Sequence, residues 1–343
     1  MWVDTGGTFT DCLAVDPEGN RRRAKVLSSG AVRVRVVEAA SSARLRLDPL
    51  GDLPAGFLDG AGVVRPGGEP VGRVASLDGA TGELTLAEPA ARPVTPGEGL
   101  EIVSGEPAPV LAARRVTGTP RGEALPELDL RLATTRGTNA LLERTGAATA
   151  LFITRGFGDL LEIGTQQRPE LFALQVVKPA PLYRRVVEVD ERLDASGEVV
   201  EELDLAALAG PIGELRAAGV SCAAVALLHS YVNPGPERRL GQHLRAHGFR
   251  HVSCSADLVA EIRLLHRADT AVADAYLGPV VGDYLAEVRP GVGARRFHVL
   301  TRAGGLHRAA EFRPRDRLLS GPAGGVVGGA ATAGRRRIVA FDM

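Results

Sequence analysis

Residues 4–11, Asp-Thr-Gly-Gly-Thr-Phe-Thr-Asp, contain two glycines, three threonines and two flanking carboxylates. Glycines let a backbone approach a ligand closely and turn its N–H groups toward it. Threonine hydroxyls donate to phosphoryl oxygens, and aspartates hold Mg²⁺ directly or through water. The pattern therefore predicts a phosphate loop with its metal ion. An ordinary hairpin turn also uses Gly-Gly beside Asp and Thr, but it needs neither the two acids nor the alternating hydroxyls.

Asp4 and Asp11 are the predicted catalytic and metal-binding residues, with holding the loop as a second role for Asp11. The predicted phosphate ligands are Gly6, Gly7, Thr8 and Thr10. Lysine is rare here, because of the 41 basic residues only Lys25 and Lys178 are not arginine. A compact ammonium suits a phosphate or substrate contact, which makes Lys25 a further candidate. Chance retention on a solvated strand is the alternative.

The elements that must position this loop are short strands. The apolar pair at 2–3 precedes the loop, the apolar run at 12–15 follows it, and the turn-rich run at 16–20 comes next. This order predicts three strands over residues 1–30, with a β-hairpin whose connection faces the ligand.

Residues 31–118 are dense in glycine and proline, and turn pairs such as Asp59-Gly60 and Asp78-Gly79 recur. Short alternating segments at 71–75 and 83–86 favour strands of a small barrel or meander. We interpret this stretch as an inserted all-β module, to which the sequence assigns no chemistry.

Residues 119–335 alternate between strand and helix patterns, which indicates an α/β fold with a largely parallel sheet and ligands at the strand carboxyl ends. Predicted strands cover 128–134, 148–154, 186–193, 222–228, 251–255 and 297–301. Predicted helices cover 138–145, 159–163, 205–218, 236–246 and 263–288. The last segment, 336–343, reads as one more strand.

Two further groups lie at strand-to-helix turns. Thr134, Thr135, Thr138 and Asn139 form a polar cluster that could contact substrate or simply cap a helix. The small-residue run at 320–329 includes Gly321, Gly324 and Gly325 and suits either an anion at a helix N-terminus or close helix packing.

Composition excludes some classes of protein. The formal net charge is zero with both signs interspersed, so neither nucleic acid nor an anionic membrane is expected as a partner. No apolar run reaches membrane-spanning length, and no signal sequence is evident. Cys12, Cys222 and Cys254 lack CxxC spacing and read as reduced core residues of a cytoplasmic protein. The length of 343 residues allows two or three domains.

The segment 4–11 resembles the first phosphate loop of the hydantoinase A/oxoprolinase family. Several later segments resemble the same family in the same order: 133–144, 154–157, 161–166, 189–192, 228–231, 320–324 and 341–343. The stretch from 163 to 172 resembles the 5-oxoprolinase branch more than the hydantoinase branch. Arg168, Glu191 and Arg192 match family positions, but we expect Glu191 and Arg192 to form an exposed ion pair.

The resemblance implies an actin-like ATPase (ribonuclease H-like) fold. In such proteins the nucleotide binds between two duplicated halves, each with its own phosphate hairpin. The apolar run at 338–341 followed by Asp342 resembles the start of the second hairpin, so Asp342 and the glycines near 321 become nucleotide-cleft candidates. The second half is missing, and we expect the chain to be an N-terminal fragment that is inactive alone.

The implied activity is ATP-dependent hydrolysis of a cyclic amide, such as 5-oxoproline or a hydantoin-like lactam, through a phosphorylated amide. ATP with Mg²⁺ or Mn²⁺, a hydantoinase B-like subunit or fused region, and an oligomeric state are implied with it. No general base is assigned; Glu143 and Asp190 are only carboxylates near family motifs. Two alternatives stay open: an acetone- or acetophenone-carboxylase-type subunit, and a non-catalytic fragment that binds a partner.

Overall fold

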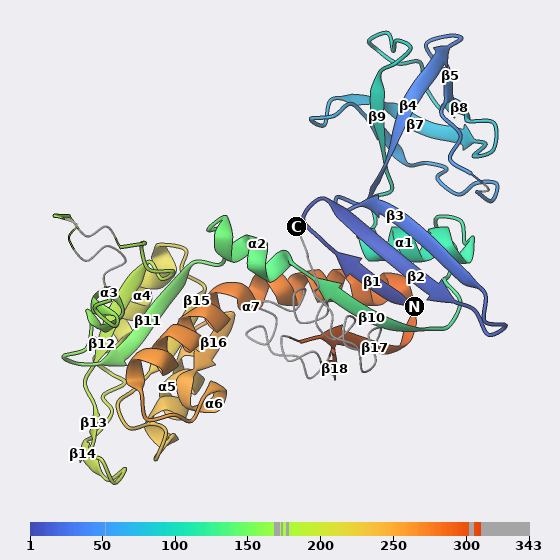
Figure 1. Ribbon diagram of the computed structural model, residues 1–343. Coiled ribbons are helices and arrows are strands. Elements are labelled where there is room, and N and C mark those ends of the chain that lie inside the picture. The colour runs from blue at the N-terminus through green and yellow to red at the C-terminus, as the bar shows by residue number, and fades with distance from the viewer. Residues whose placement is uncertain (52, 168–171, 173, 176–177, 302–304, 310–343) are drawn as a thin grey trace. The chain divides into compact units, whose positions relative to one another are not determined.

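The computed structural model describes residues 1–51, 53–167, 172, 174–175, 178–301 and 305–309 (Figure 1). The chain forms two compact units. Among the described residues, unit 1 contains 1–136 and 283–309, and unit 2 contains 137–282. The predicted region 119–335 is therefore divided between both units.

Unit 1 is built on a six-stranded sheet in the order β18-β17-β10-β1-β2-β3. Its strands are β1 (Trp2–Thr5), β2 (Phe9–Val15), β3 (Arg21–Leu27), β10 (Leu128–Thr134), β17 (Ala294–Leu300) and β18 (Leu306–Arg308). β1, β2 and β3 form the predicted antiparallel hairpins, while β10 pairs parallel to both β1 and β17. The prediction of three strands within residues 1–30 is confirmed.

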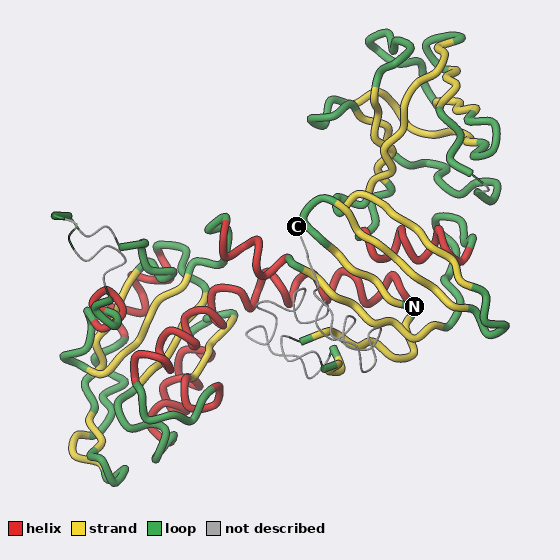
Figure 2. The backbone as a smooth tube through the Cα atoms, in the orientation of Figure 1, coloured by secondary structure: helices red, strands yellow, loops and turns green. Residues whose placement is uncertain are grey.

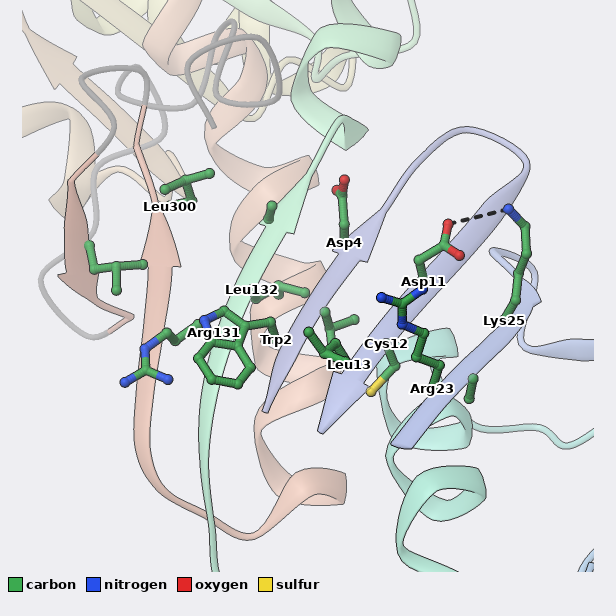
Figure 3. Close-up of a pocket in the computed structure, with 14 residues that line it drawn as sticks. Trp2, Asp4, Asp11, Cys12, Leu13, Arg23, Lys25, Arg131, Leu132 and Leu300 are labelled. Carbon is green, nitrogen blue, oxygen red and sulfur yellow. Dashed lines mark hydrogen bonds and ion pairs between the residues drawn. The ribbon is translucent and has the colours of Figure 1, made fainter. Parts of the chain in front are cut away.

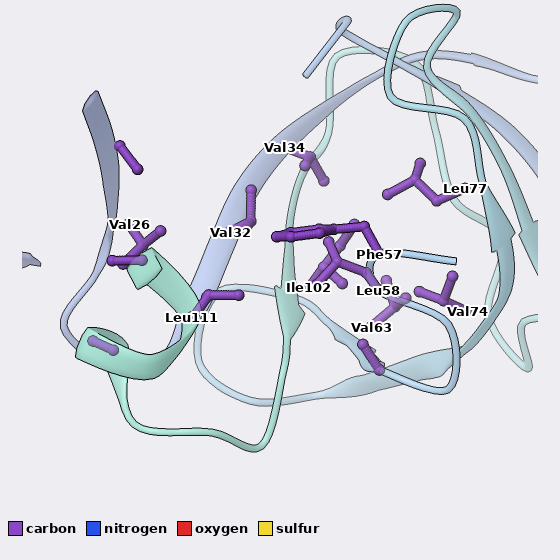
Figure 4. Packing of buried hydrophobic residues seen from close by; sticks show 14 of the residues in the cluster. Val26, Val32, Val34, Phe57, Leu58, Val63, Val74, Leu77, Ile102 and Leu111 are labelled. Carbon is purple, nitrogen blue, oxygen red and sulfur yellow. The ribbon is translucent and has the colours of Figure 1, made fainter. Parts of the chain in front are cut away.

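The next six strands close into a barrel (Figure 2). They are β4 (Ala31–Ala39), β5 (Arg44–Leu47), β6 (Gly62–Val64), β7 (Pro70–Leu77), β8 (Glu83–Leu86) and β9 (Gly99–Val103). Apolar side chains fill the interior, among them Val34, Phe57 and Ile102 (Figure 4). Closure removes the exposed sheet edges that short strands otherwise present.

Helix α1 (Ala108–Thr117) corrects the prediction that β structure extends to residue 118. Its apolar residues join the buried cluster under β1, β2 and β3. Gly291 lies so close to α1 that an added Cβ would stand 2.7 Å from a Val110 methyl. One face of the unit 1 sheet is thus covered by α1 and by the end of α7 (Leu264–Val292).

Unit 2 is a parallel four-stranded sheet in the order β12-β11-β15-β16. Its strands are β11 (Thr149–Thr154), β12 (Arg185–Val189), β15 (Cys222–Ala226) and β16 (His251–Cys254). Alternate residues of β11 enter two different cores, Phe152 on one face and Ile153 on the other. A strand buried on both faces explains the continuous apolar run in the sequence.

The remaining elements are α2 (Arg136–Leu142), α3 (Leu160–Ile163), β13 (Arg192–Leu193), β14 (Val199–Glu201), α4 (Ala209–Ala217), α5 (Gly235–Ala246), α6 (Ser255–Leu258) and the first part of α7. The predicted alternation of strands and helices from residue 128 onward is confirmed as far as residue 301. In the described part of the chain, no helix combines the length and apolar composition needed to span a bilayer.

Candidate phosphate and metal site

The loop at residues 6–8 connects β1 to β2, as predicted, and its residues reach the surface. The Gly6 N–H donates to the Phe9 carbonyl at 2.9 Å, which closes the turn. A Cβ on Gly6 would stand 3.1 Å from that carbonyl, so a side chain fits poorly. The N–H groups of Gly7 and Thr8 have no acceptor among the residues that the structure describes. Two adjacent unpaired N–H groups are suited to an anion.

Ser28, which follows β3, holds this loop in place. Its hydroxyl donates to the Gly6 carbonyl at 2.8 Å, and its N–H donates to the Thr8 carbonyl at 2.9 Å. The Ser28 and Thr10 hydroxyls are 3.0 Å apart. Sequence reasoning missed Ser28, because it lies 20 residues beyond Thr8 and only the strand pairing brings the two together.

Thr10 is placed differently from the prediction that it binds phosphate. Its side chain is fully buried and hydrogen-bonded to Ser28. Thr10 and Asp11 are neighbours on a strand, so their side chains must point to opposite faces of the sheet. Asp11 faces solvent, and the Thr10 hydroxyl therefore supports the loop from behind.

Asp4, Asp11 and Lys25 form a row across three strands on the exposed face of the sheet (Figure 3). Asp4 is paired with Asp11 in the β1–β2 register, and Asp11 with Lys25 in the β2–β3 register. Lys25 Nζ lies 3.4 Å from an Asp11 carboxylate oxygen and 4.8 Å from the centre of the Phe9 ring. The register thus brings together three of the predicted residues.

Two carboxylates on directly opposed positions repel one another, which disfavours the pair unless a cation stands near them. Lys25 supplies one positive charge, and the two oxygen donors of this row suit a hard cation such as Mg²⁺. Across the residues placed by the structure, no group of three or more His, Cys, Asp or Glu side chains could hold a metal. Mg²⁺ is commonly bound by one or two carboxylates, and phosphate oxygens and water complete its coordination shell.

A pocket of about 800 Å³ extends from this row over the same sheet face. Its second row contains Arg131, Trp2, Leu13 and Arg23, again in cross-strand register. The Arg131 guanidinium lies 4.9 Å from the centre of the Trp2 ring. This row was not predicted from the sequence. On each strand its residue lies two positions from the Asp4 row, so strand alternation places both rows on the same face.

The four residues of the polar cluster after β10 make different local contacts. The Thr134 hydroxyl is buried and accepts from the Arg136 N–H at 3.2 Å, which is the capping alternative. The Thr135 N–H donates to the Thr5 carbonyl at 3.0 Å. Thr138 and Asn139, half-buried in α2, belong to unit 2. Their predicted substrate contacts stay a prediction.

The second lysine has a structural role. Lys178 Nζ donates to the carbonyls of Glu162 and Ile163 at 2.7 and 2.9 Å. It therefore satisfies the carbonyls at the carboxyl end of α3, where a positive charge also complements the helix dipole.

Glu191 and Arg192 do not form the expected exposed ion pair. Glu191 is 1% exposed, and one of its carboxyl oxygens accepts from the Thr154 hydroxyl. Arg192 donates instead to the Arg155 carbonyl at 3.0 Å. Burial raises the pKa of Glu191 above its usual range, against the opposing effect of the Thr154 hydrogen bond. Asp190 and Glu191 lie between β12 and β13, where Asp190 pairs with Arg155 and Glu191 turns inward.

Several predicted positions lie outside the described residues: Arg168, Gly321, Gly324, Gly325 and Asp342. The glycine-rich run at 320–329 and the predicted strand at 338–341 lie there as well.

Comparison with known proteins gives two matching family models. The hydantoinase/oxoprolinase N-terminal region matches residues 100–248, and the hydantoinase/oxoprolinase model matches residues 267–343. Together they cover most of the chain beyond the barrel.

Curated relatives agree with these models. The chain is 37% identical to 5-oxoprolinase 1 of Arabidopsis thaliana over 288 residues, covering 72% of this chain and 23% of that protein. It is 37% identical to the 5-oxoprolinase of Saccharomyces cerevisiae over 248 residues, covering 62% of this chain and 19% of that protein. It is 32% identical to the acetophenone carboxylase gamma subunit of Aromatoleum aromaticum over 245 residues, covering 64% and 34%. The chain thus spans less than a quarter of the 5-oxoprolinases that it matches.

Two solved structures share the fold. Nucleotide-free acetone carboxylase matches 96% of this chain and 40% of its own with a TM-score of 0.64 at 20% identity, which supports the fold alone. The ATP-dependent caprolactamase of Pseudomonas jessenii matches 60% of this chain and 31% of its own, with a TM-score of 0.53 at 27% identity. The mixed α/β architecture, the two matching models and the 5-oxoprolinase relatives agree: the chain belongs to the hydantoinase/oxoprolinase family.

Proposed function

We propose that this chain carries the first phosphate-binding hairpin of an actin-like, ATP-dependent amide hydrolase that opens a cyclic amide such as 5-oxoproline or a hydantoin-like lactam. The observation that carries the proposal is the row of Asp4, Asp11 and Lys25 beside the loop at 6–8. The relatives named 5-oxoprolinase support the substrate class.

In this proposal each residue of the row has a distinct task. The N–H groups of Gly7 and Thr8 bind phosphate oxygens, and Lys25 neutralises charge beside them. Asp4 and Asp11 hold Mg²⁺, or Mn²⁺, which when bound neutralises the charge that develops on the phosphates during transfer. Ser28 and Thr10 keep the loop rigid, so that little rearrangement is needed when the nucleotide binds.

The proposed chemistry explains why ATP is required. The lactam oxygen attacks the γ-phosphorus, and ADP leaves. Water then adds to the activated carbon, the C–N bond breaks as the nitrogen takes up a proton, and a second water releases inorganic phosphate. An unactivated amide is a poor electrophile with a poor leaving group, and positioning with charge neutralisation supplies most of the catalysis.

The test measures phosphate release by the complete gene product with ATP and Mg²⁺, with and without 5-oxoproline. Asp4→Asn and Asp11→Asn should each lower substrate-dependent phosphate release by roughly 10²-fold or more, because each removes a charge from the metal site. Asp129→Asn is the matched control, since Asp129 lies on β10 of the same sheet but not in the pocket.

Substrate-stimulated release that is lost in both pocket variants and kept in the control supports the proposal. Equal activity in all four proteins would rule out a metal site at the Asp4–Asp11 pair. Absence of any ATP-dependent release from the complete wild-type protein would overturn the enzymatic proposal and favour a partner-binding role.

An ATP-dependent carboxylase subunit is the second candidate. The likeness to the acetophenone carboxylase gamma subunit favours it specifically. Phosphate release that depends on bicarbonate together with acetone or acetophenone, and is indifferent to 5-oxoproline, would select this candidate.

Partners and location complete the proposal. We propose that the chain works with a hydantoinase B-like subunit or fused region in an oligomer, and that it does so in the cytoplasm. The three cysteines, all buried and free of disulfides, are in keeping with a reducing compartment.

A further inference from the structure

Thr5, the last residue of β1, directly precedes the phosphate loop and is fully buried. Its hydroxyl accepts a hydrogen bond from the Tyr284 hydroxyl at 2.9 Å. Its carbonyl accepts from the Thr135 N–H at 3.0 Å. The start of the loop is therefore bonded to α7 and to the turn after β10, two segments far away in the sequence.

Tyr284 is itself held in one orientation. It is 3% exposed, and the Arg136 guanidinium lies 4.5 Å from the centre of its ring. A guanidinium over an aromatic face is attractive, and it restricts the ring to one tilt. The ring is thus contacted by Arg136 while its hydroxyl donates to Thr5.

The loop needs such support, because Gly6 and Gly7 have little conformational preference of their own. Ser28 bonds the carbonyls at both ends of the loop, Gly6 and Thr8, and the Gly6 N–H donates to the Phe9 carbonyl. The bond from the Tyr284 hydroxyl to the Thr5 side chain fixes the residue directly before the loop, which neither of these contacts reaches.

We infer that Tyr284 is a positioning residue for the phosphate loop and that it acts through the Thr5 hydroxyl. The inference rests on the proposed function of residues 6–8 as a phosphate site. Tyr284 lies on α7, one residue past the point where the chain returns from unit 2, and Arg136 is the last residue before the chain leaves unit 1.

The test removes the hydroxyl at either end of the bond. Tyr284→Phe and Thr5→Val keep the shape of each side chain, and Thr5→Ser keeps the hydroxyl. Hydrogen exchange is measured in the complete gene product at the Gly6 amide, whose N–H donates to the Phe9 carbonyl. Each of the first two variants should speed this exchange roughly 2- to 10-fold, as expected for the loss of one hydrogen bond. The Thr5→Ser variant should exchange at the wild-type rate.

The double variant decides whether the two residues act as one unit. Because each single change already breaks the same bond, Tyr284→Phe with Thr5→Val should exchange no faster than either alone. Tyr276→Phe is the control, since Tyr276 is a buried tyrosine two turns earlier on α7 and contacts Gly146 instead. It should leave the loop unchanged.

A catalytic readout accompanies the exchange. Tyr284→Phe should raise the KM for ATP while kcat changes less, because a loosened loop must be ordered when nucleotide binds. Unchanged exchange at the Gly6 amide, or equally faster exchange throughout the unit 1 sheet, would overturn the inference. If the wild-type protein showed no ATP-dependent activity, the proposed function would be overturned. The exchange data would still decide whether Tyr284 orders the loop.

Discussion

Single buried groups make the most direct predictions at the scale of the residue. Burial raises the pKa of the Cys12 and Cys254 thiols to about 12. The thiolate fraction of each then falls by roughly three orders of magnitude relative to an exposed thiol. We expect a chromogenic thiol reagent at pH 8 to modify neither residue in the folded chain and all three cysteines in denaturant. Rapid labelling of native Cys12 would show that the helix-covered face of the unit 1 sheet opens.

Glu191 predicts a pH dependence of stability. Its folded pKa is raised by burial, so the folded state binds a proton that the unfolded state has released. Stability therefore falls as pH rises from the unfolded pKa of Glu191 through its folded pKa. Glu191→Gln still accepts the Thr154 hydrogen bond but cannot ionise. As the pH is raised from 5 to 8, the variant should therefore become more stable relative to wild type. The measurement is the urea midpoint of unfolding of each protein at pH 5 and at pH 8.

The control for this measurement is the exposed Glu214 on α4. In the Glu214→Gln variant, the difference between the urea midpoints at pH 5 and pH 8 should be the same as in wild type. A Glu191→Gln variant whose urea midpoint follows that of wild type at both pH 5 and pH 8 would contradict the raised pKa of Glu191.

At the scale of the element, the joint between β3 and the barrel depends on one glycine. Gly30 has a φ of +78°, and a Cβ there would stand 2.2 Å from the Glu106 carbonyl oxygen. Gly30→Ala should lower the free energy of unfolding by more than the roughly 1–2 kcal/mol of a left-handed alanine, because the backbone must also move. Thermal unfolding measures the effect. Gly67→Ala is the matched control, since Gly67 has a φ of +100° and open space around it.

Element types were predictable where periodicity was strong. The hairpin strands and the strand–helix alternation from residue 128 followed from apolar patterning alone. Helix α1 did not, since nearly all of it is buried, it follows a proline, and no side chain caps its start. The glycine-rich neighbourhood of α1 suggested more strands instead.

The candidate site was predictable only in part, for a related reason. Asp4, Asp11 and Lys25 were candidates from the sequence because each has a chemical type that a phosphate site needs. Ser28 and Tyr284 could not, because serine and tyrosine are common and their contacts join residues 22 and 279 positions apart. Thr10 was misjudged because composition was read without the alternation of faces along β2.

At the scale of the whole molecule, the two units have separate hydrophobic cores. Phe152 is fully buried in unit 2 and contacts Phe249 edge-on at 6.0 Å between ring centres, whereas the one tryptophan, Trp2, lies in unit 1. Phe152→Ala should cost unit 2 about 3–5 kcal/mol. Denaturation of the 343-residue chain should then show a circular dichroism transition that precedes the change in Trp2 fluorescence. Coincident transitions would show that the units unfold together.

The order of strands in the unit 1 sheet has a consequence for synthesis on the ribosome. The barrel and the described part of unit 2 are each continuous in sequence, so each can fold as soon as its own residues have emerged. The sheet cannot, because β1 must wait for β10, and β10 in turn for β17, which ends at Leu300. Such long-range parallel pairing is slow to form. The hairpin of β1 and β2 is therefore translated first, but its sheet is completed only after the residues of the barrel and of unit 2 have emerged.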